Sequence, residues 1–390
     1  MRVLQLGKHY DPYVGGMETV LKEICESLSE DVRFQVLVAN TRCRTEHEHR
    51  KIPVTRVASL GKLFSCSVAP SYPVWARKFD PDLIHVHIPN PLAELSALMA
   101  DRDVPVVAQF HSDVVRQRTL LKLYGPILEA FYRRANCIVV PTPRHIEISR
   151  YVSKYRHKCR VVPFGVPVSR FELDEAGREK VDSLRDGLPS VLCVGRLVSY
   201  KGVEVLIHAL KDINARLSIV GVGPLEDSLK GLAQETGIAD RVEFLGQVSD
   251  RDLVIYYHAC DVFVLPSITN AEMFGVVQLE AMACRKPVIS TNLPTGVSWV
   301  NQHGNTGYLV TPGSPEELAL AIQRLIGNPQ LREEMGEAGR ARVERHFTST
   351  KMAEAMSQVY QEMVAEPHRS EVSVKRPHPD EAVATPAKLA

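Results

Sequence analysis

The stretch SVLCVGRLVSYKGVEVLI, residues 190–207, decides the fold because it joins a strand pattern, a glycine-bearing loop and a helix pattern. Its first residues are apolar in succession, which is typical of a strand buried on both faces of a parallel sheet. Arg196 and Lys201 flank the loop, and Gly202 opens the helix. The same order of strand, loop and helix opens the chain in LQLGKHYDPYVGGMETVL, residues 4–21.

Short apolar runs alternate with longer helical patterns along both halves of the chain. In the first half these runs are VLQL (3–6), FQVLVA (34–39), LIHVH (83–87), VVAQF (106–110) and CIVVP (137–141). In the second half they are SVLCVG (190–195), LSIVG (217–221), VEFLG (242–246), DVFVLP (261–266) and PVIS (287–290). The alternation predicts an α/β protein of two doubly wound, Rossmann-like domains, whose parallel sheets are covered on both faces.

The boundaries follow from where each set of strands begins and ends. We expect one domain over residues 1–168 and a second over 169–348, with a junction near 171–189. A last helical pattern covers residues 349–364. The terminal residues 366–390 are proline-rich and polar without an apolar period, which predicts a disordered tail.

The composition is that of a soluble protein: 390 residues, 45% hydrophobic and 24% charged. Glycine and polar residues follow the first strand too soon for a secretory segment, and no apolar run is long enough to span a bilayer. We therefore expect a cytoplasmic protein. The eight cysteines are scattered without a C-x-x-C motif, which favours reduced thiols over disulfides or a zinc site.

The net charge of +1 conceals an asymmetry between the two halves. Residues 1–168 hold 24 Lys and Arg against 16 Asp and Glu, a balance of +8, whereas the remaining residues hold 23 against 30, a balance of −7. The basic clusters RQRTLLK (116–122), RR (133–134) and KYRHKCR (154–160) together fit an anionic surface or a phosphate-bearing substrate. For any one of these clusters taken alone, an ordinary solvated helix face is the better explanation. No nucleic-acid motif is present.

Two segments of the second half hold residues suited to chemistry. Arg196 and Lys201 follow the strand at 190–195, where ligands of open α/β sheets bind, and two cations there could grip a diphosphate. Further on, NAEMFGVVQLEAMACRKPVI (270–289) places Glu272 just before a predicted helix and Glu280 inside it. A carboxylate accepts two hydroxyl hydrogens at once, which suits the vicinal diol of a ribose or hexose. A solvated loop, a capping glutamate and an exposed helical glutamate are the structural alternatives.

Taken together, the motifs resemble those of the family-4 retaining glycosyltransferases, which have the glycosyltransferase B fold and an E-x7-E signature. The resemblance covers residues 1–364, with the motifs in the expected order. Its segments are YDPYVGGMETVL (10–21), VVAQFHSD (106–113), GRLVSYKG (195–202), PSITNAEMFGVVQLEAMACRKPVI (266–289) and GNTGYLVTPGSPEELALAI (304–322). One segment, TNLPTGVSWV (291–300), departs from the family's commonest pattern, so contacts from Thr295 and Gly296 are not carried over.

The resemblance implies a role for each matching residue. The catalytic set would be His111 beside the donor sugar, Arg196 and Lys201 at the leaving diphosphate, and Glu272 at the sugar hydroxyls. The donor-binding set would be Gly15, Gly16, Arg196, Lys201, Gly221, Gly223, Val248, Glu272, Met273, Phe274, Gly275, Val276, Val277 and Glu280, with Glu280 on the ribose. The acceptor set would be Tyr13, His87 and Arg116. The first domain would take the acceptor, the second the sugar nucleotide, and the helix at 349–364 would cross back to the first domain.

The expected reaction is metal-independent transfer of a hexose, with retention, from a UDP- or GDP-hexose to a hydroxyl of a saccharide or lipid-linked saccharide. The expected setting is bacterial surface polysaccharide assembly, as O-antigen, capsule or exopolysaccharide. No cofactor is expected. A sugar-nucleotide epimerase of similar architecture and a non-catalytic sugar-nucleotide-binding protein are the alternatives.

A metal is not expected because both D-x-D triplets have structural explanations. Asp101–Asp103 lies in a turn, and Ser249 with Asp252 resembles a helix capping box. His85 and His87 share one strand face but lack a third ligand. Peripheral attachment to an anionic membrane is a further hypothesis, and it rests on Arg116, Arg118, Lys122, Arg133 and Arg134.

Overall fold

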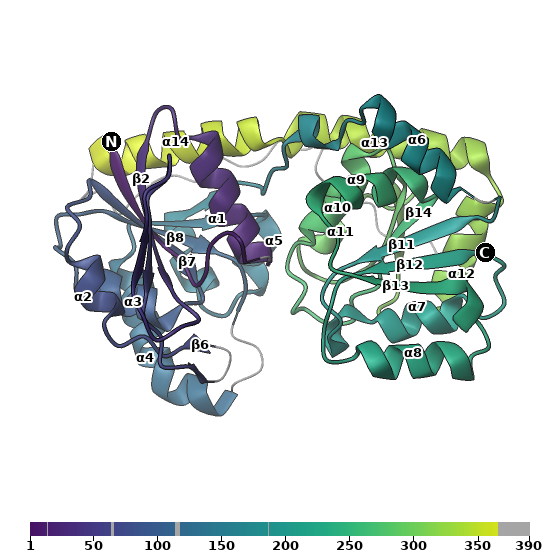
Figure 1. The fold of residues 1–390 in the computed structure, drawn as a ribbon. Coiled ribbons are helices and arrows are strands. Elements are labelled where there is room, and N and C mark those ends of the chain that lie inside the picture. Colours follow the sequence, from purple (N-terminus) through teal and green to yellow (C-terminus); the bar gives the residue numbers. More distant parts are fainter. Residues whose placement is uncertain (14, 64–65, 114–117, 186, 366–390) are drawn as a thin grey trace. The chain divides into compact units, whose positions relative to one another are not determined.

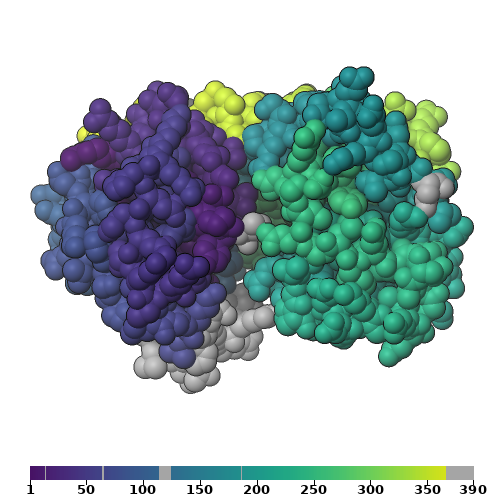
Figure 2. All heavy atoms as spheres, viewed as in Figure 1, coloured from purple at the N-terminus to yellow at the C-terminus, as the bar shows by residue number. Residues whose placement is uncertain are grey.

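The computed structural model describes residues 1–13, 15–63, 66–113, 118–185 and 187–365, with the side chains of 118–123 excepted. The chain divides into two compact units (Figure 1). The N-terminal unit contains residues 1–165 and the described residues from Ser349 onward, and the C-terminal unit contains residues 166–348. The predicted boundary lay after residue 168. In Figure 2 side chains fill the space between the ribbons of each unit.

The N-terminal unit is built on a sheet of eight strands in the order β10-β9-β8-β7-β1-β2-β4-β3. The strands are β1 (Arg2–Leu6), β2 (Arg33–Ala39), β3 (Glu46–Glu48), β4 (Val54–Val57), β7 (Leu83–Ile88), β8 (Val106–Phe110), β9 (Cys137–Val140) and β10 (Cys159–Val161). All pairs are parallel except β3 with β4. A separate hairpin joins β5 (Lys62–Leu63) to β6 (Cys66–Ser67).

The order reverses at β1, which lies between β2 and β7, so right-handed connections place helices on both faces. The helices are α1 (Gly16–Ser27), α2 (Tyr72–Ala76), α3 (Pro91–Leu98), α4 (Arg118–Arg134), α5 (Pro143–Ile148), the 3-10 helix η1 (Val152–Lys158) and α14 (Ser349–Ala365). The last helix packs on α1, β7 and β8, and α3 packs on α2 and α4. The expectation that the final helix returns to the first domain is confirmed.

The C-terminal unit has a wholly parallel sheet in the order β13-β12-β11-β14-β15-β16. Its strands are β11 (Ser190–Val194), β12 (Arg216–Val220), β13 (Val242–Gly246), β14 (Val262–Leu265), β15 (Val288–Thr291) and β16 (Gly307–Val310). Its α-helices are α6 (Glu175–Leu184), α7 (Val203–Ala209), α8 (Glu226–Glu235), α9 (Asp250–Ala259), α10 (Val276–Ala283), α11 (Val297–Val300), α12 (Pro315–Ile326) and α13 (Pro329–His346). Its 3-10 helices are η2 (Val168–Phe171), η3 (Ser199–Lys201) and η4 (Ala239–Arg241). Figure 1 shows α7 and α8 on one side of this sheet and α9 and α10 on the other.

The predicted strands all form, and the α/β class is confirmed. The sequence analysis did not predict β3, β4, β5, β6, β10 and β16, which are short or carry polar residues. It also placed the junction near residues 171–189, but that stretch contains α6, which packs on α9 within the C-terminal unit. Asp174 caps α6 by accepting a hydrogen bond from the Gly177 amide at 2.8 Å, so the segment is an ordered helix.

Each sheet is the centre of an apolar core. In the C-terminal unit Val191 and Leu192 of β11 and Leu206 of α7 have no exposed surface. Burial of a side chain of this size stabilises a fold by about 1.5–3 kcal/mol. Among the described residues, none of the helices combines the length and the apolar character that crossing a bilayer needs.

The glycine that opens β16 gives a test of the sheet packing. Gly307 has φ +148°, and a Cβ atom there would lie 1.8 Å from the Val288 carbonyl oxygen of β15. We expect Gly307→Ala to lower the free energy of unfolding by about 3 kcal/mol or more. Gly304→Ala is the matched control, because Gly304 also has a positive φ, +76°, but nothing lies within 4 Å of its added methyl. Its loss should be about 1 kcal/mol. Equal losses in denaturant titrations would contradict the close approach of β15 and β16.

Candidate functional site

The strand order of the C-terminal sheet reverses between β11 and β14, and ligands of open parallel sheets bind outside the carboxyl ends of strands at such a point. The loops that follow these two strands touch. Gly202 has φ +64°, and a Cβ atom there would lie 2.2 Å from the Pro266 carbonyl oxygen. The Ile268 amide donates to the Tyr200 carbonyl across the same contact, at 2.8 Å. Glycine alone fits this approach, which brings Lys201 to Glu272.

Lys201 and Glu272 form an ion pair at the reversal point. Lys201 Nζ lies 2.5 Å from Glu272 Oε2, and the two side chains expose only 13% and 10% of their surface. Ser267 Oγ donates to the same carboxylate oxygen at 2.9 Å. Burial opposes the charge on Lys201, but Glu272, together with Tyr200 and Cys193, outweighs burial, so the pKa of Lys201 is raised. The lysine is therefore a cation at neutral pH.

This pairing was not predicted. The sequence assigned Lys201 to a phosphate and Glu272 to sugar hydroxyls as separate contacts, whereas the structure joins the two side chains. The segment that departs from the family pattern supports the same loop. Thr295 Oγ1 donates to the Glu272 carbonyl at 2.8 Å, and the Gly296 amide donates to the Met273 carbonyl at 2.7 Å. Thr295 and Gly296 thus fix the backbone that presents Glu272.

Glu280 lies inside α10, one turn beyond the helix start, as the sequence predicts. Tyr257 Oη donates to Glu280 Oε2 at 2.7 Å. Burial raises the pKa of Glu280, and the hydrogen bond from Tyr257 only partly offsets this effect. The hydrogen bonds of the described residues engage only Oε2 of this carboxylate, so Oε1 can accept from a ligand hydroxyl.

The start of α10 lies between the two glutamates. Gly275 precedes the helix with φ +71°, and no side chain caps the helix. Among the residues assigned to the donor, Met273 and Phe274 have buried side chains, so that a ligand meets their backbone, while Val276 and Val277 are partly exposed. Uncapped amides at a helix N-terminus attract anions or hydroxyl oxygens.

The other donor-side residues surround the loop after β11. Arg196 is exposed, and no hydrogen bond of its side chain is formed within the described residues. Packing explains why residues 221 and 223 are glycines. Cβ atoms at Gly221 and Gly223 would lie 2.0 and 2.3 Å from the carbonyl oxygens of Gly195 and Leu197. Val248 follows β13 and is partly exposed.

The N-terminal unit carries His111 at the end of β8. His111 Nε2 lies 2.9 Å from His87 Nδ1, and its ring stacks on Phe164 at a centroid distance of 5.5 Å. Burial lowers the pKa of His111 to about 3, so the ring is neutral at pH 7. His87 was assigned to the acceptor, but its side chain has no exposed surface and both ring nitrogens are hydrogen bonded. His87 therefore supports His111 and offers no contact to an acceptor.

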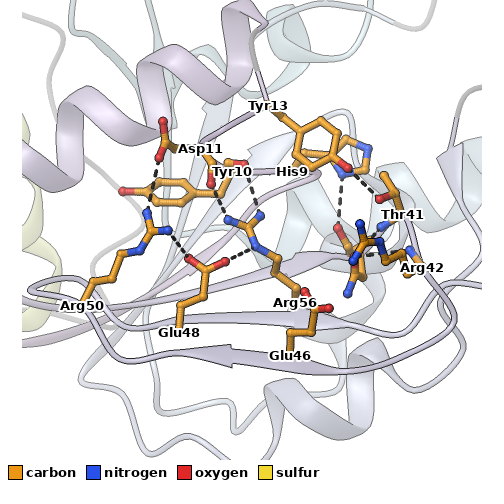
Figure 3. A network of polar contacts seen from close by, with 12 residues as sticks. His9, Tyr10, Asp11, Tyr13, Thr41, Arg42, Glu46, Glu48, Arg50 and Arg56 are labelled. Carbon is orange, nitrogen blue, oxygen red and sulfur yellow. Dashed lines mark hydrogen bonds and ion pairs between the residues drawn. The ribbon is translucent and has the colours of Figure 1, made fainter.

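Tyr13 and the two glycines lie in the loop between β1 and α1. Tyr13 is 38% exposed, stacks on His9 and donates to Thr41 Oγ1 at 2.7 Å (Figure 3). Gly15 precedes α1 with an extended backbone, and Gly16 is exposed with nothing near its missing side chain. Packing therefore does not require a glycine at position 16, and the expected contact of Gly16 with a ligand stays a prediction.

Arg56 of β4 hydrogen bonds to the backbone of the loop between β1 and α1. Arg56 is buried, with 4% of its surface exposed. Its guanidinium donates to the carbonyl oxygens of Tyr10 and Asp11 and to the carboxylate of Glu48 (Figure 3). Arg50 bridges the carboxylates of Asp11 and Glu48 at 3.5 and 3.3 Å. A buried arginine that is fully paired fixes the backbone it contacts, and β4 was missed because this arginine interrupts its apolar pattern.

Two side chains of the basic clusters bind backbone carbonyl oxygens of the N-terminal unit. Arg134 donates to the carbonyl oxygens of Asp101 and Val104, and Lys158 donates to those of Arg133 and Ala135. These side chains hold their own unit together. Arg116 and the side chains of Arg118 and Lys122 lie outside the described residues.

The D-x-D triplets have the geometry that the sequence suggests. Ser249 Oγ accepts from the Asp252 amide at 3.1 Å and donates to its carboxylate at 2.6 Å, which caps α9. Asp101 accepts from the Asp103 amide at 3.1 Å. In the part of the chain that the structure describes, no group of three or more His, Cys, Asp or Glu side chains could hold a metal ion.

Glu280 yields a test that concerns stability. Its pKa is raised in the folded chain, so ionised Glu280 destabilises the fold above the pKa of the unfolded chain. We expect Glu280→Gln to raise the melting temperature at pH 7, and we expect the gain to vanish as the pH falls to about 4, where the carboxyl is protonated in both states. Glu243→Gln, at an exposed position of β13, should change little at either pH. A gain of the same size at both pH values would contradict a buried carboxylate.

Comparison with known proteins agrees with this geometry. The family described as "Glycosyl transferases group 1" matches residues 178–342, and the family described as "Glycosyltransferase Family 4" matches residues 14–170. A D-rhamnosyltransferase of Pseudomonas aeruginosa is 34% identical over 90% of this chain and 93% of its own length. The O-antigen chain mannosyltransferase C of Escherichia coli is 31% identical over 92% of this chain and 98% of its own length.

Solved structures have the same fold. Sucrose-phosphate synthase of Thermosynechococcus elongatus superposes with a TM-score of 0.80 at 25% identity, over 93% of this chain and 99% of that one. The Anabaena protein HepE, solved with UDP-glucose, gives 0.76 at 20% identity, over 93% of this chain and all of that one. With two sequence families matched along the chain and relatives similar over nearly their whole length, this chain belongs to glycosyltransferase family 4 and is a glycosyltransferase of the B fold.

Proposed function

We propose that this glycosyltransferase moves a hexose, with retention and without a metal ion, from a nucleotide-diphosphate sugar to a hydroxyl of a saccharide that is free or lipid-linked. The observation that carries the proposal is the cluster of Lys201, Glu272 and Ser267 at the point where the C-terminal sheet reverses. A cation that is buried and kept charged suits a leaving diphosphate, and a carboxylate held beside it suits sugar hydroxyls.

The finer donor assignment rests on the relatives. Two relatives that match more than 30% of positions over nearly the whole chain are named for rhamnosyl and mannosyl transfer, and mycobacterial relatives that match about half of this chain are named as GDP-mannose-dependent. Rhamnose and mannose share the configuration at carbon 2. We therefore assign a GDP-linked hexose of manno configuration as the donor and the assembly of bacterial surface polysaccharide as the setting.

The mechanism follows from the groups that each unit supplies. Arg196 is exposed at the loop after β11, and Lys201 is charged beside it, so both can stabilise negative charge on a leaving diphosphate. The proposed reaction needs no protein nucleophile: an oxygen of the leaving diphosphate takes the proton of the acceptor hydroxyl on the face where the new bond forms. Glu272 then binds the hydroxyls of the donor sugar and orients the sugar. The rate enhancement comes from positioning the substrates and from stabilising the charge on the leaving diphosphate.

The proposed activity can be tested by incubation with GDP-, UDP- and dTDP-hexoses and an oligosaccharide acceptor. We expect a glycosidic bond whose anomeric configuration equals that of the donor, formed at an unchanged rate in EDTA. Loss of turnover in EDTA with recovery in Mn²⁺ or Mg²⁺ would contradict metal independence. Interconversion of sugar nucleotides without acceptor would instead favour an epimerase, and binding without any turnover a non-catalytic protein.

Glu280→Ala tests the donor side separately. We expect weaker binding of the nucleoside diphosphate by about 10- to 150-fold in calorimetry, because one or two hydrogen bonds to a charged group are worth about 1.5–3 kcal/mol. Glu243→Ala removes an exposed carboxylate of the same unit and serves as the control. Equal affinity of wild type and Glu280→Ala, with both folded, would remove Glu280 from the binding site.

A further inference from the structure

A row of polar side chains crosses the centre of the N-terminal sheet, where apolar residues are the rule. Gln5 of β1 and His85 and His87 of β7 have no exposed surface. Gln5 stands opposite His85 in the register of the two strands, and residues two apart on a strand share a face, so all three side chains lie on one face. Most buried polar groups in proteins are hydrogen bonded, so the partners of these three side chains matter.

The row forms a continuous chain of hydrogen bonds from α14 to His111. The Tyr360 hydroxyl of α14 lies 2.7 Å from His85 Nδ1, and Gln5 Nε2 donates to that hydroxyl at 3.0 Å. Gln5 Oε1 lies 3.0 Å from His87 Nε2. His87 Nδ1 lies 2.9 Å from His111 Nε2, which ends the chain.

The primary amide of Gln5 gives this chain a direction. Its nitrogen is used toward Tyr360, so its oxygen faces His87 and can only accept, which places a proton on His87 Nε2. Burial lowers the pKa of His87 well below its usual range, so the ring carries that single proton. His87 Nδ1 is then a lone pair that accepts from His111 Nε2–H. His111 is also neutral, and its own lone pair is therefore on Nδ1.

We propose that Gln5, His87 and Tyr360 are positioning residues, which hold His111 in the tautomer protonated at Nε2 and present its Nδ1 as a hydrogen-bond acceptor to a hydroxyl of the donor sugar. The contact with sugar rests on the proposed function. The tautomer does not, because it follows from hydrogen bonds within the N-terminal unit. A hydroxyl is the partner expected for such a nitrogen, whereas a phosphate oxygen would require an N–H.

The tautomer can be read directly in the full chain labelled with ¹⁵N-histidine, from long-range ¹H–¹⁵N correlations, with the His111→Gln spectrum to assign the signals. We expect His111 to show a protonated Nε2 and an unprotonated Nδ1. Gln5→Met keeps the side-chain volume but removes both amide bonds, so His87 and His111 should each show a mixture of tautomers. Tyr360→Phe is the milder variant, which frees the Gln5 nitrogen and His85 Nδ1 but leaves the Gln5 amide in place. It should shift the signals of His87 and His111 as well as those of His85.

Tyr132→Phe is the matched control, because Tyr132 is a buried tyrosine of the same unit that is absent from the chain of hydrogen bonds. Its histidine spectrum should equal that of wild type. A wild-type His111 protonated at Nδ1 would overturn the proposal, and so would histidine signals that stay unchanged in both folded variants. A generic loss of packing would instead shift the control as well.

Activity separates this proposal from the one on which its sugar contact rests. Tyr360→Phe should lower kcat/KM for the donor by about two- to tenfold, the effect of one weakened neutral hydrogen bond, while nucleoside diphosphate affinity stays constant. The expected tautomer in a protein that uses no sugar nucleotide would refute the proposed function and leave the positioning chain standing. The expected activity together with a His111 protonated at Nδ1 would support the proposed function and refute the positioning chain.

Discussion

The contact between Gly202 and the Pro266 carbonyl determines where the charges of the C-terminal unit lie. It joins the loops after two neighbouring strands at the point where the sheet order reverses, and it needs both a positive φ and the absence of a side chain. Lys201 precedes this glycine, so its amino group reaches the carboxylate of Glu272. A larger residue at 202 would separate the two loops and break the ion pair in a partly buried place, which is costly.

Both units use a buried, paired charge to fix a loop that follows a central strand. In the N-terminal unit the charge is Arg56, which binds two carbonyl oxygens of the loop that carries Tyr13. In the C-terminal unit it is Lys201, whose partner Glu272 is held in turn by Thr295. The guanidinium of Arg56 is bonded within its own unit, whereas the ammonium of Lys201 pairs with one carboxylate and, under the proposed function, would also meet a phosphate. The planar guanidinium of arginine suits fixed hydrogen bonds to several backbone groups, whereas the compact ammonium of lysine suits contact with a single anion.

Local patterns in the sequence were sufficient for the central strands of both sheets, for the helix that begins between Glu272 and Glu280, and for the family. Runs of apolar β-branched residues predict buried parallel strands reliably, and the glycine loops mark their ends. Contacts between distant residues were beyond such patterns. Nothing near Tyr257 indicates that its hydroxyl reaches Glu280, and the role of His87 depends on Gln5 and Tyr360, which come from opposite ends of the chain. A paired histidine in a strand looks the same in sequence whether it faces a ligand or a neighbour.

The return of α14 to the N-terminal unit has a consequence for biosynthesis. Residues 1–165 emerge from the ribosome long before Tyr360 is synthesised. Until then Gln5 and His85 lack the hydroxyl that joins them in the finished unit. The C-terminal unit, in contrast, is continuous and has its whole sequence by residue 348. The half of the molecule that is translated first is therefore completed last, and nascent chains spend that interval with an unfinished sheet face that chaperones can recognise.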